Sequence, residues 1–155
     1  MKYVTKQLKF PTSEKIVRGF WEKLPRTERD GRPFFALAPM ADVTDNPFRE
    51  MIAKYSRMGE KDGGPDVIWT EFVATGGLTS IAKEKMLRDF EYTERQRPIV
   101  AQIFGHDPDK FFESAQLCTE LGFDGIDINM GCPADVINNQ CAGAALIKDP
   151  ELAKE

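Results

Sequence analysis

The sequence predicts an α/β fold, a parallel sheet covered by helices, with about the first four of the eight units of a (β/α)8 TIM barrel. Apolar segments alternate with amphipathic helical segments in the order β-α-β-α-β-α-β, which is typical of parallel strands joined by helical crossovers. No Gly-x-Gly-x-x-Gly pattern follows an apolar segment, which disfavours a dinucleotide-binding sheet. A complete barrel has about 250 residues, so we expect this chain of 155 residues to hold the N-terminal half.

The first unit begins with residues 33–40 (PFFALAPM), a run that is apolar throughout and predicts a buried strand. Asn46 is predicted to cap the helix that follows, with Pro47 at the first helical position. Apolar residues then recur at helical spacing, and Gly59 is predicted to end the element.

The next units follow the same plan. Strands are predicted over residues 66–72, 98–105 and 125–131, and helices over residues 78–90 and 107–122. The buried side of the first of these helices is expected to carry Leu78, Ile81, Ala82 and Met86. The second is expected to begin at the Asp107-Pro108 pair and to end at Gly122.

Two regions are expected along the chain: an N-terminal leader at residues 1–33 and the half-barrel at residues 34–155. The apolar leader residues that are predicted to pack on the barrel are Phe20, Trp21 and Leu24. A partner-binding helix is the alternative for this segment. The Asp149-Pro150 pair starts a further helix close to the last residue, so we expect the N-terminal part of a longer protein, with a naturally short protein as the alternative.

The composition is that of a globular protein, with 41% hydrophobic and 30% charged residues. No apolar run approaches the ~20 residues of a membrane helix, and the N-terminus lacks an apolar signal core. The net charge of -4 argues against a large basic nucleic-acid surface in this segment. The cysteines at positions 118, 132 and 141 match no zinc spacing and leave an odd thiol, which indicates a reducing cytoplasm and predicts no metal site.

Candidate site residues stand at the ends of all four predicted strands, where barrel enzymes place their catalytic groups. They are Pro39-Met40-Ala41, Glu71, Gln102 and Asn129-Met130-Gly131-Cys132-Pro133. Glu71 could instead be a solvated carboxylate, and the two amides could serve only neighbouring backbone. A tight turn that holds Cys132 at the end of a buried strand is well suited to proton chemistry.

Four segments together resemble one enzyme family, the tRNA-dihydrouridine synthases. The segments are APMADVTDNPFR, TEFVATGGL, PIVAQIFGHDP and DGIDINMGCPADVINNQCAGAALIKDP. The match extends over roughly residues 34–152, and the order and spacing of the four are far more specific than any one of them. The resemblance implies a flavoenzyme that reduces the C5–C6 bond of uridine in tRNA, with FMN as cofactor and NADPH or NADH as reductant.

The resemblance also implies roles for individual residues. The flavin would be lined by Pro39, Met40, Ala41, Gln102 and Asn129. Asn129 and Glu71 would contact the substrate. The reduced flavin would give hydride to C6 of uracil, and Cys132 would protonate C5. A thiol with an ordinary pKa of about 8.5 is largely protonated at neutral pH, so it suits this task.

Other candidates for proton chemistry receive different interpretations. Cys118 lies on an apolar helix face and is predicted to pack in the core. Cys141 follows the last predicted strand and is the alternative acid. His106 is interpreted as a loop residue beside a helix cap. The family's later flavin contacts, a lysine and a histidine, its phosphate site and its RNA-binding domain would lie beyond residue 155.

Alternatives of function remain open. A flavin barrel acting on free pyrimidines, of the dihydroorotate or dihydropyrimidine dehydrogenase type, is the enzymatic one. The second alternative function is that of a non-catalytic half-barrel used for binding. The predicted partner is tRNA, bound chiefly through another domain, and no membrane partner is expected. Half of a barrel leaves strand edges unpaired, so we also expect self-association or poor solubility.

Overall fold

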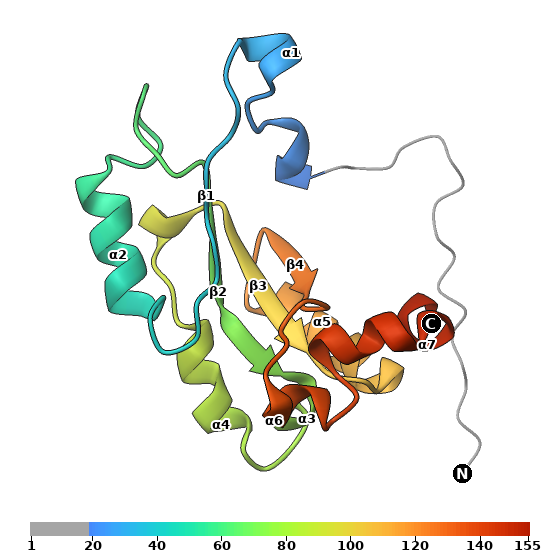
Figure 1. Cartoon of the computed structure of the whole chain (residues 1–155). Helices are drawn as coiled ribbons and strands as arrows, with labels where there is room; N and C mark the ends of the chain where they lie inside the picture. The colour runs from blue at the N-terminus through green and yellow to red at the C-terminus, as the bar shows by residue number, and fades with distance from the viewer. Residues whose placement is uncertain (1–18) are drawn as a thin grey trace.

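Four parallel strands form one sheet in the computed structural model, which describes residues 19–155. The strands are β1 (Ala36–Leu37), β2 (Val67–Ala74), β3 (Ile99–Phe104) and β4 (Gly125–Ile128). Their order in the sheet is β1-β2-β3-β4, so each crossover advances by one strand in the same direction (Figure 1). The predicted parallel α/β sheet is therefore confirmed. Strands added in sequence order distinguish this sheet from doubly wound folds, in which the order reverses at a switch point.

β1 is much shorter than the predicted strand at residues 33–40. Only Ala36 and Leu37 pair with β2, on one side. Pro33 and Pro39 flank the pair and have no N–H to donate to a ladder. The start of β1 is fixed instead by Asp66, which accepts from the Phe35 N–H at 2.8 Å.

Helix α2 (Asn46–Tyr55) has a different cap from the predicted one. Asp45, not Asn46, precedes the first turn, and its Oδ1 accepts from the Phe48 N–H at 2.9 Å. Asn46 is the first helical residue, and its side-chain oxygen accepts from Gln96 Nε2 at 2.7 Å. The prediction was wrong by one residue because both residue types make good caps.

Helix α5 (Pro108–Glu120) begins where it was predicted to begin. Asp107 Oδ1 accepts from the Asp109 N–H at 3.1 Å, and Pro108 occupies the first turn. Gly122 has a φ of 79°, the left-handed conformation that commonly follows a helix end. The start of α7 (Pro150–Lys154) is likewise confirmed, because Asp149 accepts from the Leu152 N–H at 3.1 Å.

The single helix predicted over residues 78–90 is wrong. The segment contains the end of α3 (Thr75–Leu78), α4 (Lys83–Met86) and the 3-10 turn η2 (Leu87–Phe90). Ile81, placed on the buried side by the helical pattern, is fully exposed. The hydroxyl of Ser80 donates to the Gly77 carbonyl and accepts from the Ala82 N–H, so it replaces the helical hydrogen bonds at this point.

Five further short elements complete the described chain. They are η1 (Gly19–Glu22), α1 (Thr27–Asp30), η3 (Glu94–Gln96), α6 (Asp135–Asn138) and η4 (Gly143–Lys148). Figure 1 shows α3 and α6 near the edge toward which the strands point, and α1 at the opposite edge. The carboxyl ends of the strands therefore meet beside α3 and α6, where parallel folds place their sites.

Alternate residues of the strands face two different layers. Ile99, Ala101 and Ile103 of β3 pack in the clusters that include the helices. Val100 faces the opposite layer, where Val67 and Leu24 complete a small cluster. Because successive side chains point to opposite faces, Gln102 lies on the same face as Val100.

The leader contributes to that second layer. Phe20 and Leu24 pack with Val67 and Val100, and the rings of Trp21 and Trp69 lie 6.0 Å apart. The predicted packing of these leader residues is confirmed, whereas residues 1–18 of the leader lie outside the described residues. A side chain at Gly125 would lie 3.1 Å from the Phe20 ring, so glycine makes room for this contact.

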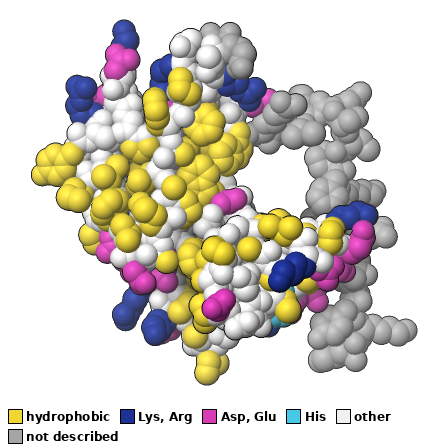
Figure 2. All heavy atoms as spheres, viewed as in Figure 1, with side chains coloured by type: hydrophobic (Ala, Val, Ile, Leu, Met, Phe, Trp, Pro, Cys, Tyr) yellow, Lys and Arg dark blue, Asp and Glu magenta, His cyan; other side chains and the backbone are white. Residues whose placement is uncertain are grey.

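Apolar side chains are exposed at both ends of the sheet. Phe35, Met51 and Tyr55 are exposed at the end formed by β1 and α2, where Figure 2 shows hydrophobic side chains gathered over one face. Ile126 and Ile128 are exposed on β4. Apolar surface is thus exposed at both ends of the sheet.

Candidate active site

The register of the sheet brings three residues of different strands side by side at the carboxyl edge. Gln102 of β3 is level with Phe72 of β2 and with Asp127 of β4. A register shift between Trp69 and Phe72 produces this alignment. The three residues line an open pocket of about 440 Å3, whose other lining residues are Pro39, Ile128, Asn129, Met130, Gly131 and Cys132.

Three polar side chains of this pocket form a connected relay. Gln102 Nε2 donates to Asp127 Oδ2 at 2.6 Å, and Asn129 Nδ2 donates to Gln102 Oε1 at 3.2 Å. Asn129 Oδ1 accepts in turn from two backbone N–H groups, those of Gly131 at 3.1 Å and Cys132 at 2.9 Å. The relay therefore connects β3 and β4 to the turn that carries Cys132.

The backbone of Cys132 is held from two sides. Its N–H donates to Asn129, and its carbonyl accepts from the Ala144 N–H at 3.0 Å. A side chain at Gly143 would lie 2.7 Å from that carbonyl oxygen, and Gly143 also has a φ of 60°. Glycine is required at this point because both the close approach and the left-handed backbone disfavour any other residue. The half-buried thiol is thus carried on a fixed turn.

The two amides have hydrogen-bonding capacity left after these contacts. Counting the bonds made among the described residues, Gln102 retains one N–H and one acceptor lone pair, and Asn129 retains one N–H. Two donors and one acceptor are the complement of a cyclic imide edge, which presents two carbonyls around one N–H. Flavin and uracil both carry such an edge, so the chemistry of the donor set fits either ring.

The other residues expected at the flavin are distributed unevenly. Pro39 lines the pocket, whereas Met40 and Ala41 are exposed and outside its lining. Thr44 fixes their loop, because its hydroxyl accepts from the Met40 N–H at 2.9 Å. The structure thus brings Pro39 together with the amides and Cys132, and leaves Met40 and Ala41 on the rim.

Glu71 lies beside the pocket rather than in its lining. It is half-buried in β2, and its Oε1 accepts from the Asp42 N–H at 2.5 Å. Burial is the main cause that raises the pKa of Glu71, and the Asp42 N–H opposes it. Asp89 raises this pKa further and Arg49 lowers it. Glu71 therefore ties the loop after β1 to β2.

Arg49, which the sequence did not single out, supports the same loop from behind. It is fully buried in α2. Its guanidinium donates to the Thr44 carbonyl, to the Glu91 carbonyl at 2.5 Å and to Gln96 Oε1 at 3.1 Å. Because a buried cation needs several acceptors, these bonds fix the loop that carries Met40 and Ala41. Burial lowers the pKa of Arg49.

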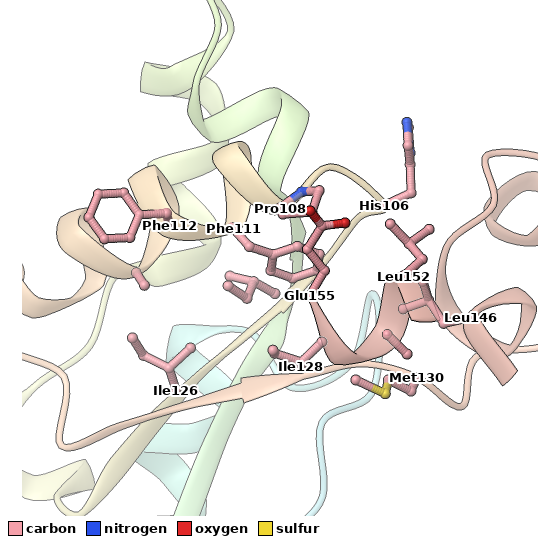
Figure 3. Close-up of a pocket in the computed structure, with 13 residues that line it drawn as sticks. His106, Pro108, Phe111, Phe112, Ile126, Ile128, Met130, Leu146, Leu152 and Glu155 are labelled. Carbon is pink, nitrogen blue, oxygen red and sulfur yellow. The ribbon is translucent and has the colours of Figure 1, made fainter. Parts of the chain in front are cut away.

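The remaining cysteines and the histidine lie elsewhere. Cys118 is fully buried in the core, as predicted, and burial raises its pKa to about 11. Cys141 is exposed on a left-handed turn. His106 is exposed and borders a different pocket of about 510 Å3. Figure 3 shows that this pocket is walled by apolar side chains of β4, α5 and α7.

The larger pocket does not carry the chemistry. Its walls include Ile103 and Ile126, on the face of the sheet that α5 covers, and Phe111 of α5 itself. The pocket with Cys132 is the one in which a thiol, two amides and a carboxylate converge. We therefore assign the candidate active site to the latter.

Asp127 is the pocket residue that sequence reasoning missed. The alternation Gly-Ile-Asp-Ile in β4 contained the signal, because it places an acid on the face opposite the two isoleucines. Its partner Gln102 is 25 positions away in sequence, and only the register of β3 with β4 shows that the two are level.

Neither a membrane-spanning helix nor a metal-binding cluster occurs in the part of the chain that the structure describes. No helix in residues 19–155 is long and apolar enough to cross a membrane. No cluster of three or more His, Cys, Asp or Glu side chains in that range is arranged to hold a metal ion.

A sequentially wound parallel sheet with a thiol and amides at its carboxyl edge belongs to the α/β class that places its sites at strand ends. The family model described as "Dihydrouridine synthase (Dus)" matches residues 36–155. The chain belongs to the dihydrouridine synthase family, and the resemblance in its four motifs is confirmed.

Curated relatives agree with this assignment. The "Probable tRNA-dihydrouridine synthase 2" of Bacillus subtilis (strain 168) is 38% identical over 141 residues, which are 90% of this chain and 39% of the relative. The "Probable tRNA-dihydrouridine synthase" of Staphylococcus aureus (strain COL) is 38% identical over 137 residues, or 88% of this chain and 38% of the relative. The chain thus spans well under half the length of these relatives.

Proposed function

We propose that this chain is the N-terminal, cysteine-bearing half of the barrel of a tRNA-dihydrouridine synthase. It would reduce the C5–C6 bond of uridine in tRNA, with FMN as cofactor and NADPH or NADH as the source of electrons. Family membership supports the reaction class. The observation that carries the proposal is the convergence of Cys132 with Gln102 and Asn129 in one pocket at the carboxyl edge of the sheet.

The residues of this pocket divide the work by their chemistry. Gln102 and Asn129 together leave two donors and one acceptor, and these would bind and orient the imide edge of FMN, with Pro39 against the ring. Bound FMN, once reduced, would supply hydride for C6 of the uracil ring. Asn129 and Glu71 would contact the substrate.

Cys132 would complete the reduction by transferring its thiol proton to C5. Hydride arrival at C6 leaves a pair of electrons shared between C5 and O4, and the new C5–H bond takes up that pair. The thiolate that remains would be reprotonated from water. The fixed turn around Cys132 supports this role, because a general acid must be held within hydrogen-bond reach of the atom that it protonates.

The fold supports the proposal of a half-barrel at residues 34–155, preceded by a leader at residues 1–33. Four strands in sequential order would form the start of a (β/α)8 barrel, and further strands would pair with the free edges of β1 and β4. The exposed Ile126 and Ile128 and the apolar pocket in Figure 3 would then be covered. In the isolated chain, a second copy would cover them.

The predicted location is the cytoplasm, because three free thiols and a tRNA substrate suit a reducing compartment. The net charge of -4 indicates that most phosphate contacts of the tRNA would be made outside this segment. A uridine stacked in tRNA would have to be extruded to reach the pocket.

A chimera tests the proposed function. Residues 36–155 of this chain replace the matched segment of the Bacillus subtilis relative, which supplies the rest of the length. The purified chimera is examined for flavin absorbance and then incubated with NADPH and tRNA that lacks dihydrouridine. Formation of dihydrouridine in the tRNA, measured by mass spectrometry, is the expected result.

Two other outcomes would point to the alternative functions. A chimera that carries flavin but reduces free uracil or oxidises dihydroorotate, and leaves tRNA unchanged, would indicate an enzyme of free pyrimidines. A folded chimera that binds neither FMN nor any flavin analogue that NADPH can reduce would indicate a non-catalytic binding module. The unmodified relative, treated in the same way, is the positive control.

A further inference from the structure

Asp127 terminates the relay of side chains in the pocket. Its Oδ2 accepts from Gln102 Nε2 at 2.6 Å, the shortest of the four bonds in the relay. The side chain is half-buried and lines the same pocket as Cys132. It is therefore part of the site, two positions before Asn129 and five positions before Cys132 in the sequence.

The chemistry of its carboxylate gives the relay a direction. A carboxylate only accepts hydrogen bonds, whereas a side-chain amide has a donating and an accepting end. Gln102 must therefore turn Nε2 toward Asp127, which leaves Oε1 toward Asn129. Asn129 then turns Nδ2 toward Gln102 and Oδ1 toward the N–H groups of Gly131 and Cys132.

We propose that Asp127 is a positioning residue that fixes the orientation of the Gln102 amide and, through Asn129, the place of the Cys132 turn. Its meaning for catalysis rests on the proposed function of Cys132. If the acceptor at position 127 is removed, Gln102 is free to turn its amide over and present a donor to the donor of Asn129. Asn129 can then keep its bonds to the turn only if it loses its bond to Gln102. Without that bond the Asn129 amide is held less firmly, so the turn loosens.

The test measures the reactivity of Cys132 in the 155-residue chain without flavin or tRNA. The chain is alkylated with iodoacetamide, and mass spectrometry follows the label on each cysteine with time. Cys141, which is exposed, is the internal standard, and the buried Cys118 reports any general unfolding. The quantity compared between variants is the ratio of the alkylation rate of Cys132 to the alkylation rate of Cys141.

Three variants separate the hydrogen bond from the charge. Asp127→Ala removes both, and we expect the ratio to rise about threefold to tenfold, the change in population that one lost hydrogen bond allows. Asp127→Asn keeps an acceptor and removes the charge, so its ratio should stay within about twofold of the original. Asp135→Ala removes an exposed acid three residues after Cys132, outside the relay, and should leave the ratio unchanged.

Two results would overturn the inference. The first is an unchanged ratio in Asp127→Ala while Cys118 stays unlabelled. The second is an equal rise in Asp127→Asn and Asp127→Ala, which would assign the effect to charge. Because the alkylation measurement uses neither cofactor nor substrate, a negative result there would not contradict the proposed reaction. An inactive chimera, in turn, would not contradict the positioning of Cys132 by Asp127.

Discussion

The N–H of Cys132 donates to Asn129 Oδ1 at 2.9 Å, across a turn that begins where β4 ends. This bond connects the proposed acid with a proposed ligand of flavin and uracil. Asn129 also donates to Gln102, so Asn129 fixes the turn while Gln102 connects it to β3. The thiol and the imide-binding groups are consequently placed by one set of bonds, and a change in either amide is expected to affect both.

Gln102→Ala is predicted to weaken FMN binding by about 1–3 kcal/mol, because it removes a donor and an acceptor from a partly buried site. Titration of the flavin-free chimera with FMN, followed by fluorescence, measures the change. Gln116→Ala, at an exposed position of α5, is the matched control and should bind as the parent does. Equal affinity in Gln102→Ala and the parent would return Gln102 to a purely structural role.

Glu71→Gln is predicted to raise the melting temperature at pH 7. Burial raises the pKa of Glu71 above its ordinary value of 4.5, so the folded state binds this proton more tightly than the unfolded state does. The resulting contribution to stability is present below pH 4.5 and is lost as the pH rises through the raised pKa. Glutamine keeps an acceptor for the Asp42 N–H without the charge. Thermal unfolding at pH 7 and pH 4 measures the effect, which should disappear at the lower pH.

Asp66→Asn is the control, because its expected change in melting temperature at pH 7 has the opposite sign. The hydrogen bond from Arg32 is the main cause that lowers the pKa of Asp66, so its contribution is present above the ordinary value of 3.8 and lost as the pH falls through the lowered pKa. This variant should melt at a lower temperature than the parent at pH 7. If Glu71→Gln also melts lower at pH 7, the destabilising effect of burial on the Glu71 carboxylate is contradicted.

The isolated chain is predicted to self-associate through the apolar ends of its sheet. Phe112 of α5 is exposed beside the apolar pocket, and Tyr55 of α2 is exposed at the other end. Phe112→Lys and Tyr55→Lys should therefore shift the chain toward the monomer in size exclusion. Ile81→Lys changes an equally apolar, fully exposed residue away from both ends and should have no such effect. A parent chain that already elutes as a monomer would refute the prediction.

The sequence predicted those features that depend on local pattern. Apolar strands alternating with helices predicted the parallel sheet, and the Asp-Pro pairs at 107 and 149 predicted two helix starts. The broken helix around Ser80 was missed because helical spacing of apolar residues does not show where a hydroxyl competes with the backbone. The cap of α2 was also misplaced by one residue, because Asp45 and Asn46 are both of a residue type that caps helices well.

The candidate site was predicted in part of its members and not in its connections. Gln102, Asn129 and Cys132 were identified at strand ends, and the structure places them in one pocket. Asp127 depends on the register of two strands, and the role of Arg49 depends on two backbone carbonyls and the side-chain oxygen of Gln96. Such contacts between distant segments leave no periodic signal in a single sequence.

The central claim is that Cys132 is the acid of a uridine reduction, and Cys132→Ala in the chimera tests it most directly. Flavin content and flavin reduction by NADPH should remain close to those of the parent, and the rate of dihydrouridine formation in tRNA should fall by roughly 10²–10⁴-fold, the usual contribution of a positioned acid. Cys141→Ala should keep the rate of the parent. Full activity in Cys132→Ala, or its loss in Cys141→Ala instead, would contradict the account.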